Sequence, residues 1–222
     1  MKETDLGKLI KNLPAGPGII GKDEYFNSAV LIPLIKADKE YYFLFEKRSA
    51  KIRQGGEVCF PGGEFDKKTD PDFKETAIRE TEEELGISRD KINIIGQLDT
   101  FVGPMGVTVD SFIGEIKINS LDEFTIDKNE VEKVFTIPVS FFANNKPEEY
   151  QYQLEMHPHY IDEKGEKVEL FPVEKLGLPL RYSKPRKGKN HKVYIYKTEP
   201  EIVWGITAAL IREFIHKLNY KT

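Results

Sequence analysis

The sequence TAIRETEEELGI, residues 76–87, guides the interpretation of the whole chain. A helix turns by about 100° per residue, so its apolar side chains, such as Ala77 and Leu85, share one arc, as expected for a face that packs on a core. Gly86 follows, and glycine commonly ends a helix in the left-handed conformation. We therefore predict a helix over residues 72–85.

Three glutamates of this predicted helix, Glu80, Glu83 and Glu84, share a neighbouring arc. Like charges at these spacings repel by a few tenths of a kcal/mol per pair, and a bound divalent cation would offset that repulsion. Carboxylate oxygens suit Mg²⁺ or Mn²⁺, which also bridge to the phosphate groups of a substrate. Arg79 has the spacing to contact Glu83 and orient it. The cluster therefore predicts a site for Mg²⁺ or Mn²⁺.

A run of glutamates is also typical of a solvated helix face, and the helix alone leaves that alternative open. The sequence Pro61-Gly62-Gly63 lies upstream, and glycine lets a backbone approach a metal ion or a phosphate closely. Such a triplet alone is typical of many ordinary turns. The triplet and the acidic helix in this order, with Arg79-Glu80 between them, favour a metal and phosphate site.

The composition limits the class of protein. The chain has 222 residues with 14 Phe and 10 Tyr, which can fill a sizeable core, so disorder of the whole chain is excluded. The formal net charge of −4 lacks the basic excess of a nucleic-acid-binding protein. The single Cys excludes a disulfide framework and a Cys-rich zinc site. No signal peptide and no membrane-spanning run is visible, so we expect a soluble cytoplasmic protein without a membrane partner.

The rest of the chain predicts strands mixed with helices, as in an α/β or α+β sandwich. Strands are expected at residues 28–35, 41–46, 57–60, 93–99, 107–118 and 131–139, an amphipathic helix followed by a turn within residues 1–22, and a closing helix over residues 203–218. The strand at residues 57–60 is expected to stop at Pro61. Residues 144–198 are less regular. Their basic stretch, Arg181–Lys192, is expected at an exposed hairpin tip, and binding of a phosphate or of a membrane surface is its alternative role. We expect one domain over residues 1–222, with an insertion-like segment at residues 144–198.

Residues 79–87, RETEEELGI, resemble the second half of the signature of the Nudix hydrolase family, which reads R-E-U-x-E-E-x-G-U with U an aliphatic residue. Thr81 replaces the first aliphatic residue. The stretch from Gly63 to Arg79 is longer than in the family pattern, and Pro71 stands where the first glutamate of the signature is expected. That glutamate is therefore not assigned to any residue of this chain.

Within this family the chain looks like the coenzyme A (CoA) pyrophosphatase branch. Residues 44–63, LFEKRSAKIRQGGEVCFPGG, are similar to a segment that this branch carries. The Asp-containing loop at residues 62–70 and the string VWGITA at residues 203–208 also resemble the branch. The resemblance is strong over residues 42–140 and 200–215 and weak over the insertion-like segment. It implies an α/β fold, a Nudix-type α/β/α sandwich with a mixed β-sheet.

The resemblance also implies an activity, the metal-dependent hydrolysis of the diphosphate bond of CoA or acyl-CoA. The products would be 3′,5′-ADP and 4′-phosphopantetheine or its acyl derivative. In this interpretation Mg²⁺ or Mn²⁺ is held by Glu80, Glu83, Glu84 and the backbone carbonyl of Gly63. Arg79 lies beside these carboxylates and orients Glu83. A glutamate takes the proton from the attacking water, and the candidates are Glu83 and Glu130, which lies on a later loop.

Substrate contacts are expected from Arg48 and Arg53, since arginine binds phosphate bidentately, and from the backbone at Gly62. Surface ion pairing is the alternative role for the two arginines. The expected partner is a small nucleotide and not a nucleic acid. Residues 144–198 would serve either the substrate side or a contact in a homodimer.

Two further functions stay open at this stage. A Nudix pyrophosphatase could act on another nucleoside diphosphate derivative, such as ADP-ribose, NADH or a diadenosine polyphosphate. A Nudix-fold module could also bind without catalysis, although the intact carboxylates of the predicted helix argue against that.

Overall fold

The computed structural model describes residues 3–219, so the first two residues of the expected N-terminal helical segment lie outside it. One mixed sheet forms the centre of the molecule. Its strands are β1 (Phe26–Ala37), β2 (Glu40–Arg48), β3 (Val58–Cys59), β4 (Gly62–Glu64), β5 (Ile92–Gln97), β6 (Phe101–Gly103), β7 (Val107–Ile116) and β8 (Val131–Pro138). The order is β3-β2-β1-β7-β5, with β4 on β1, β6 on β7 and β8 on β2. Strands β1 and β7 are parallel, and the other pairs are antiparallel.

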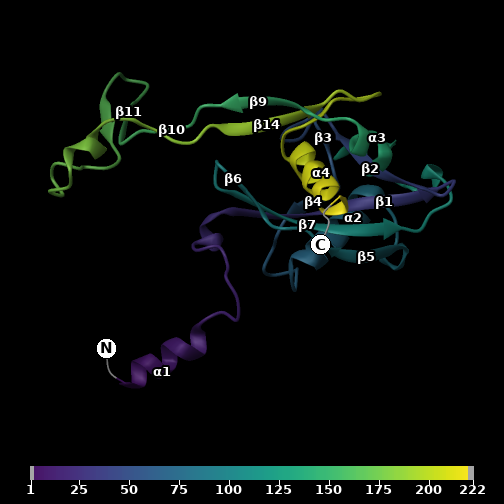
Figure 1. Cartoon of the computed structure of the whole chain (residues 1–222), viewed down its shortest axis with the longest axis horizontal. Helices are drawn as coiled ribbons and strands as arrows, with labels where there is room; N and C mark the ends of the chain where they lie inside the picture. The colour runs from purple at the N-terminus through teal and green to yellow at the C-terminus, as the bar shows by residue number, and fades with distance from the viewer. Residues whose placement is uncertain (1–2, 220–222) are drawn as a thin grey trace.

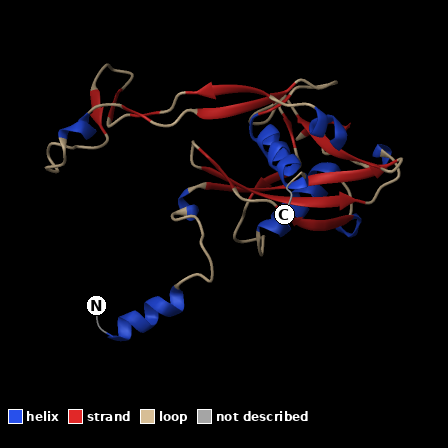
Figure 2. Cartoon of the chain, in the orientation of Figure 1, coloured by secondary structure: helices blue, strands red, loops and turns tan. Residues whose placement is uncertain are grey.

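Helices cover both faces of this sheet. The helices are α1 (Glu3–Asn12), α2 (Phe73–Leu85), α3 (Val139–Asn144) and α4 (Gly205–Leu218), with short 3₁₀ turns η1 (Lys22–Glu24), η2 (Arg89–Lys91), η3 (Leu121–Glu123) and η4 (Leu180–Ser183). On β1, Ala29 and Leu31 pack with α2, whereas Ile32 packs with the phenylalanines beneath α3 and α4. The expected α/β/α sandwich with a mixed sheet is confirmed (Figure 2).

Helix α2 begins and ends where its local sequence predicts. The Asp72 carboxylate caps the first turn by accepting a hydrogen bond from the Glu75 N–H at 2.9 Å. Gly86 follows the last turn at φ 62°, in the left-handed region, and its N–H donates to the Glu82 carbonyl. The prediction of a helix over residues 72–85 is therefore confirmed to within one residue.

The predicted stop of the strand at Pro61 is confirmed, because β3 ends at Cys59. The chain then re-enters the sheet as β4, which pairs with β1 in the register Val30↔Gly62. One predicted boundary is wrong for a tertiary reason. Val203 and Trp204 belong to a short strand, β15 (Val203–Trp204), that pairs with β14, and the closing helix starts only at Gly205.

Residues 144–198 form a long arm that leaves the large sheet (Figure 1). Its strands are β9 (Glu148–Tyr152), β10 (Glu155–Met156), β11 (His159–Ile161), β12 (Lys167–Glu169), β13 (Arg186–Lys187) and β14 (His191–Tyr196). The basic stretch is exposed as expected, but it is not a hairpin tip, because β13 within it pairs with β10.

The N-terminal helix α1 lies apart from the sheet (Figure 1). It exposes the apolar side chains Leu6, Leu9 and Ile10. The chain joins the body at Lys22, whose ammonium group pairs with the buried carboxylate of Asp110. Among the described residues, no helix combines the length and the apolar character needed to cross a bilayer.

Candidate active site

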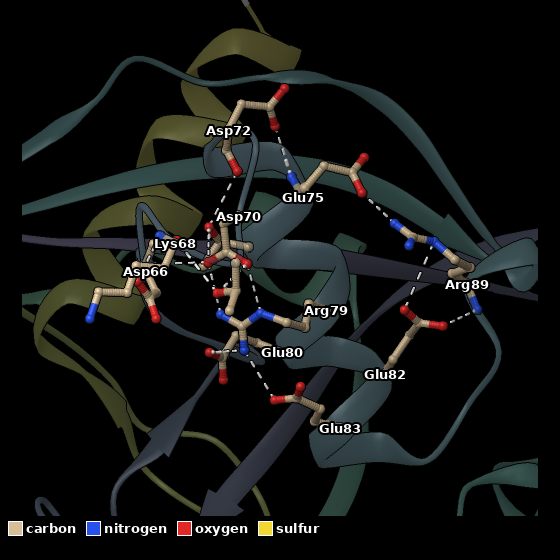
Figure 3. Close-up of polar contacts among 12 residues, drawn as sticks. Asp66, Lys68, Asp70, Asp72, Glu75, Arg79, Glu80, Glu82, Glu83 and Arg89 are labelled. Carbon is tan, nitrogen blue, oxygen red and sulfur yellow. Dashed lines mark hydrogen bonds and ion pairs between the residues drawn. The ribbon is translucent and has the colours of Figure 1, made fainter.

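Arg79 organises the acidic face of α2 (Figure 3). Its NH1 donates to Glu80 Oε1 at 2.7 Å and to Glu83 Oε2 at 3.1 Å. The predicted contact between Arg79 and Glu83 is therefore confirmed. The hydrogen bond from Arg79 fixes one oxygen of Glu83. The Glu83 side chain is 59% exposed and therefore remains open to solvent.

The opposite side of the Arg79 guanidinium binds Asp70, a residue that the sequence analysis missed. Nε and NH2 donate to the two Asp70 oxygens at 2.8 and 2.9 Å. The Asp70 carboxylate also accepts from Thr76 Oγ1 and from the Asp66 N–H (Figure 3). These contacts, above all the one with Arg79, hold the pKa of Asp70 well below its usual range. Asp70 directly precedes Pro71, the residue that blocked the assignment of the first acidic position.

Replacing Asp70 by Asn is expected to destabilise the protein by about 2–3 kcal/mol, because Arg79 loses a buried partner. The lowered pKa means that this stabilisation is present above the ordinary carboxyl pKa and is lost as the pH falls through the folded-state value. The difference in unfolding free energy should therefore be full at pH 7 and shrink toward pH 2, as measured by urea unfolding. Asp99→Asn, which removes only an exposed pair with Lys217, is the control and should leave the urea midpoint unchanged. A difference that grew on acidification would contradict this account.

The most buried carboxylates of the site are Glu84 on α2 and Glu46 on β2. Glu84 is 2% exposed and accepts a hydrogen bond from the Gly62 N–H at 2.9 Å. Glu46 is 1% exposed and accepts from the Cys59 thiol at 3.2 Å. Burial raises the pKa of both carboxyl groups, and the charge of Glu46 raises that of Glu84 further. Burial likewise raises the pKa of the Cys59 thiol, which does not suit a nucleophile.

Two glycines bring the backbone close to these acids. A side chain at Gly62 would overlap the Ala29 carbonyl and the Val30 backbone on β1. A side chain at Gly63 would overlap the carboxylate of Glu80. The strand β4 therefore lies directly against the acidic face of α2.

Glu130 and Arg48 are brought to the same place by the pairing of β2 with β8. Arg48 is the register partner of Val131, and the Ser49 N–H donates to the Glu130 carbonyl at 2.7 Å. The Glu130 charge raises the pKa of both Glu46 and Glu80, although burial is the larger cause for each. Glu130 itself is exposed.

The two candidate phosphate-binding arginines differ in position. Arg48 lies beside Cys59, Glu84 and Glu46, and its charge lowers the pKa of both glutamates. Its Nε donates to the Arg53 carbonyl at 3.3 Å. The Arg53 guanidinium lies 5.9 Å from the centroid of the Phe26 ring. The charge of Arg48 therefore acts on both buried carboxylates, whereas Arg53 holds Arg48 through its backbone carbonyl.

The donors at this site fit a hard divalent cation. Within residues 3–219, no three carboxylate, imidazole or thiol groups already converge on one point, since Arg79 holds Glu80 and Glu83 while the Gly62 N–H holds Glu84. The buried Glu46 Oε2, however, has no hydrogen-bond partner in the same range. Oxygen donors in excess of the available positive charge are what Mg²⁺ and Mn²⁺ require.

Comparison with known families agrees with this geometry. The NUDIX domain model matches residues 25–197, which is most of the chain, and the chain belongs to the Nudix family. The expected class of enzyme, a Nudix pyrophosphatase, is thereby confirmed.

The individual relatives share less than a third of their aligned residues with this chain. A Yersinia enterocolitica protein named "Uncharacterized Nudix hydrolase NudL" is 29% identical over 91% of this chain and 86% of its own length. A protein of the same name from Photorhabdus laumondii is 29% identical over 89% of this chain and 87% of its own length. Among solved structures, a MutT/nudix family protein from Enterococcus faecalis covers 99% of this chain and 70% of its own, with 13% identity and a TM-score of 0.47. A C. elegans Ap4A hydrolase structure covers 51% of this chain and 80% of its own, with 19% identity and a TM-score of 0.43.

Proposed function

We propose that this Nudix hydrolase cleaves the diphosphate bond of CoA or acyl-CoA with Mg²⁺ or Mn²⁺, giving 3′,5′-ADP and 4′-phosphopantetheine or its acyl derivative. The observation that carries the proposal is the position of Arg48. Residues 44–63, which resemble the CoA branch, fold as β2, a loop, β3 and β4. In this fold the Arg48 charge acts on the buried Glu46 and Glu84, and the same guanidinium would bind the phosphate.

The proposed roles follow from where each group lies. A divalent cation held by Glu80, Glu83, Glu84 and the Gly63 carbonyl supplies positive charge for the phosphate oxygens and makes a bound water more acidic. Glu83 or Glu130, the two exposed acids of the site, takes the proton from the attacking water.

The arginines and the glycine turn complete these proposed roles. Arg79 orients Glu80 and Glu83 from one side. Arg48 binds the diphosphate, Arg53 supports it, and the backbone at Gly62 leaves room for the phosphate to approach.

The test is a product analysis with three substrates. The purified chain is incubated with CoA, NADH or ADP-ribose, in the presence of Mg²⁺, Mn²⁺ or EDTA, and the products are resolved by mass spectrometry. We expect 3′,5′-ADP from CoA with either metal and none with EDTA. Cleavage of NADH or ADP-ribose alone would reject CoA as the substrate but keep the hydrolase. CoA binding without turnover of any substrate would point to a silent binding module.

The proposal extends to the organisation of the whole chain. Residues 1–222 act as one cytoplasmic domain, and the arm at residues 144–198 serves either the substrate side or a homodimer contact. The exposed tyrosines of β9, Tyr150 and Tyr152, are apolar surface that either role would use.

A further inference from the structure

The buried glutamate on β2 lies outside the ligand set proposed above. Glu46 is 1% exposed, and its Oε1 accepts the Cys59 hydrogen bond. Its Oε2 has no hydrogen-bond partner among the described residues. An ionised carboxylate buried without compensation is costly, so this oxygen calls for either a proton or a cation.

The charges around Glu46 do not supply that compensation. Glu84 lies near it, and the negative charge of Glu46 raises the pKa of Glu84. Glu130 adds a further negative charge. Arg48 is the cationic group that acts on both Glu46 and Glu84. One guanidinium thus acts on a group of three carboxyls, and negative charge is in excess whenever all three are ionised.

The backbone places Glu46 directly opposite the acidic helix. Glu46 is the register partner of Cys59 on β3, and the chain then turns through Pro61 into Gly62. The Gly62 N–H holds Glu84 from α2. Carboxylates from the strand side and from the helix side therefore meet at the same short turn.

We propose that Glu46 is a further ligand of the divalent cation, which is then held between β2 and α2 instead of by the helix alone. This inference rests on the proposed function, because it assumes that the acidic helix binds Mg²⁺ or Mn²⁺. The free Oε2 is the donor atom, and hard cations of this kind take carboxylate oxygens in near-octahedral sites. In the alternative, Glu46 and Glu84 share a proton and Glu46 never contacts the ion.

The test is Mn²⁺ binding to the metal-free full chain without substrate, with free Mn²⁺ measured by electron paramagnetic resonance. Glu46→Gln should raise the Kd for Mn²⁺ by about tenfold or more. The matched control is Glu132→Gln on β8, whose exposed side chain pairs with Lys47, and its Kd should stay within about twofold of the parent value.

Thermal unfolding gives a second readout that a merely structural role would not produce. Without metal, Glu46→Gln should leave the Tm unchanged or raise it, because it removes one of the crowded negative charges. With saturating Mn²⁺, the rise in Tm should be smaller than for the parent, because the ion binds less tightly. A lower Tm in both conditions by the same amount would overturn the proposal.

Glu84→Gln separates this inference from the proposed function. If Glu84→Gln abolishes Mn²⁺ binding while Glu46→Gln leaves the Kd unchanged, the metal site stands and the role of Glu46 is rejected. If the parent chain binds no Mn²⁺, both the proposed metal site and the role of Glu46 are rejected. If Glu46→Gln does not fold, Glu46→Asp keeps the charge but shortens the reach, and an unchanged Kd for that variant would equally overturn the inference.

Discussion

Glu83→Gln should lower kcat/KM for the metal-dependent cleavage by about 10³-fold and leave the fold intact. The substitution removes both a proposed metal ligand and a candidate base, and losses of this size are typical of such groups. The Tm should change little, since the Glu83 side chain is 59% exposed and pairs with its i, i+4 neighbour Arg79. Steady-state kinetics and a thermal unfolding curve on the same preparation check both statements.

The adjacent glutamate provides a matched control. Glu82 receives the same substitution one residue earlier on the same helix, but its carboxylate accepts from the Arg89 N–H at 2.8 Å and faces away from Arg79 (Figure 3). Glu82→Gln should retain near-parental kcat/KM. If both variants lost activity equally, a general effect of charge on the helix would explain the loss, and the specific role of Glu83 would be rejected.

Substituting the two glycines of β4 should give opposite results at neighbouring positions. Gly62→Ala forces a methyl group into the backbone of β1, which cannot move without opening the β1–β4 pairing. We expect a loss of about 3 kcal/mol or more and a fall in Tm of roughly 10 °C. At Gly63 the three atoms nearest to an added methyl group belong to the Glu80 carboxylate, which can shift more easily than backbone, so for Gly63→Ala the Tm should hold while kcat/KM falls by at least about tenfold.

Gly96→Ala is the control for both, because an added methyl group at Gly96 has no atom within 4 Å. It should change neither the Tm nor kcat/KM. A stable, active Gly62→Ala variant would contradict the close approach of β4 to β1. An active Gly63→Ala variant would show that the position of the Glu80 carboxylate does not matter for catalysis.

The sequence predicts the acidic helix well because its determinants are local. The cap at Asp72, the apolar arc and Gly86 all lie within one short stretch, so periodicity and capping preferences suffice. The central strands are similarly visible as apolar runs, since residues such as Leu31 and Ile32 are buried on opposite faces of the sheet.

The parts that escaped prediction depend on contacts between distant segments. Strand β4 consists of two glycines and a glutamate, residues without strand preference, and it exists because β1 offers a free edge there. Asp70 pairs with Arg79, which lies 9 residues further along the chain, and Glu46 accepts a hydrogen bond from Cys59, 13 residues away. A glutamate that follows the apolar residues of a predicted buried strand, as in the sequence LFEKR, is the one signal that could have drawn attention to Glu46, because charged side chains are rarely buried.

The four hydrogen bonds of Arg79 have a consequence for the charge of the ion that the proposed site would bind. The guanidinium already gives one positive charge to Glu80, Glu83 and Asp70 through four hydrogen bonds. In the proposed site, a cation would share Glu80 and Glu83 with the guanidinium that orients them, so it would meet carboxylates whose charge is already partly neutralised. Coulomb attraction scales with the charge of the ion, so a divalent ion would gain about twice as much as a monovalent ion from the negative charge that remains. The proposed site should therefore favour Mg²⁺ or Mn²⁺ over Na⁺ or K⁺.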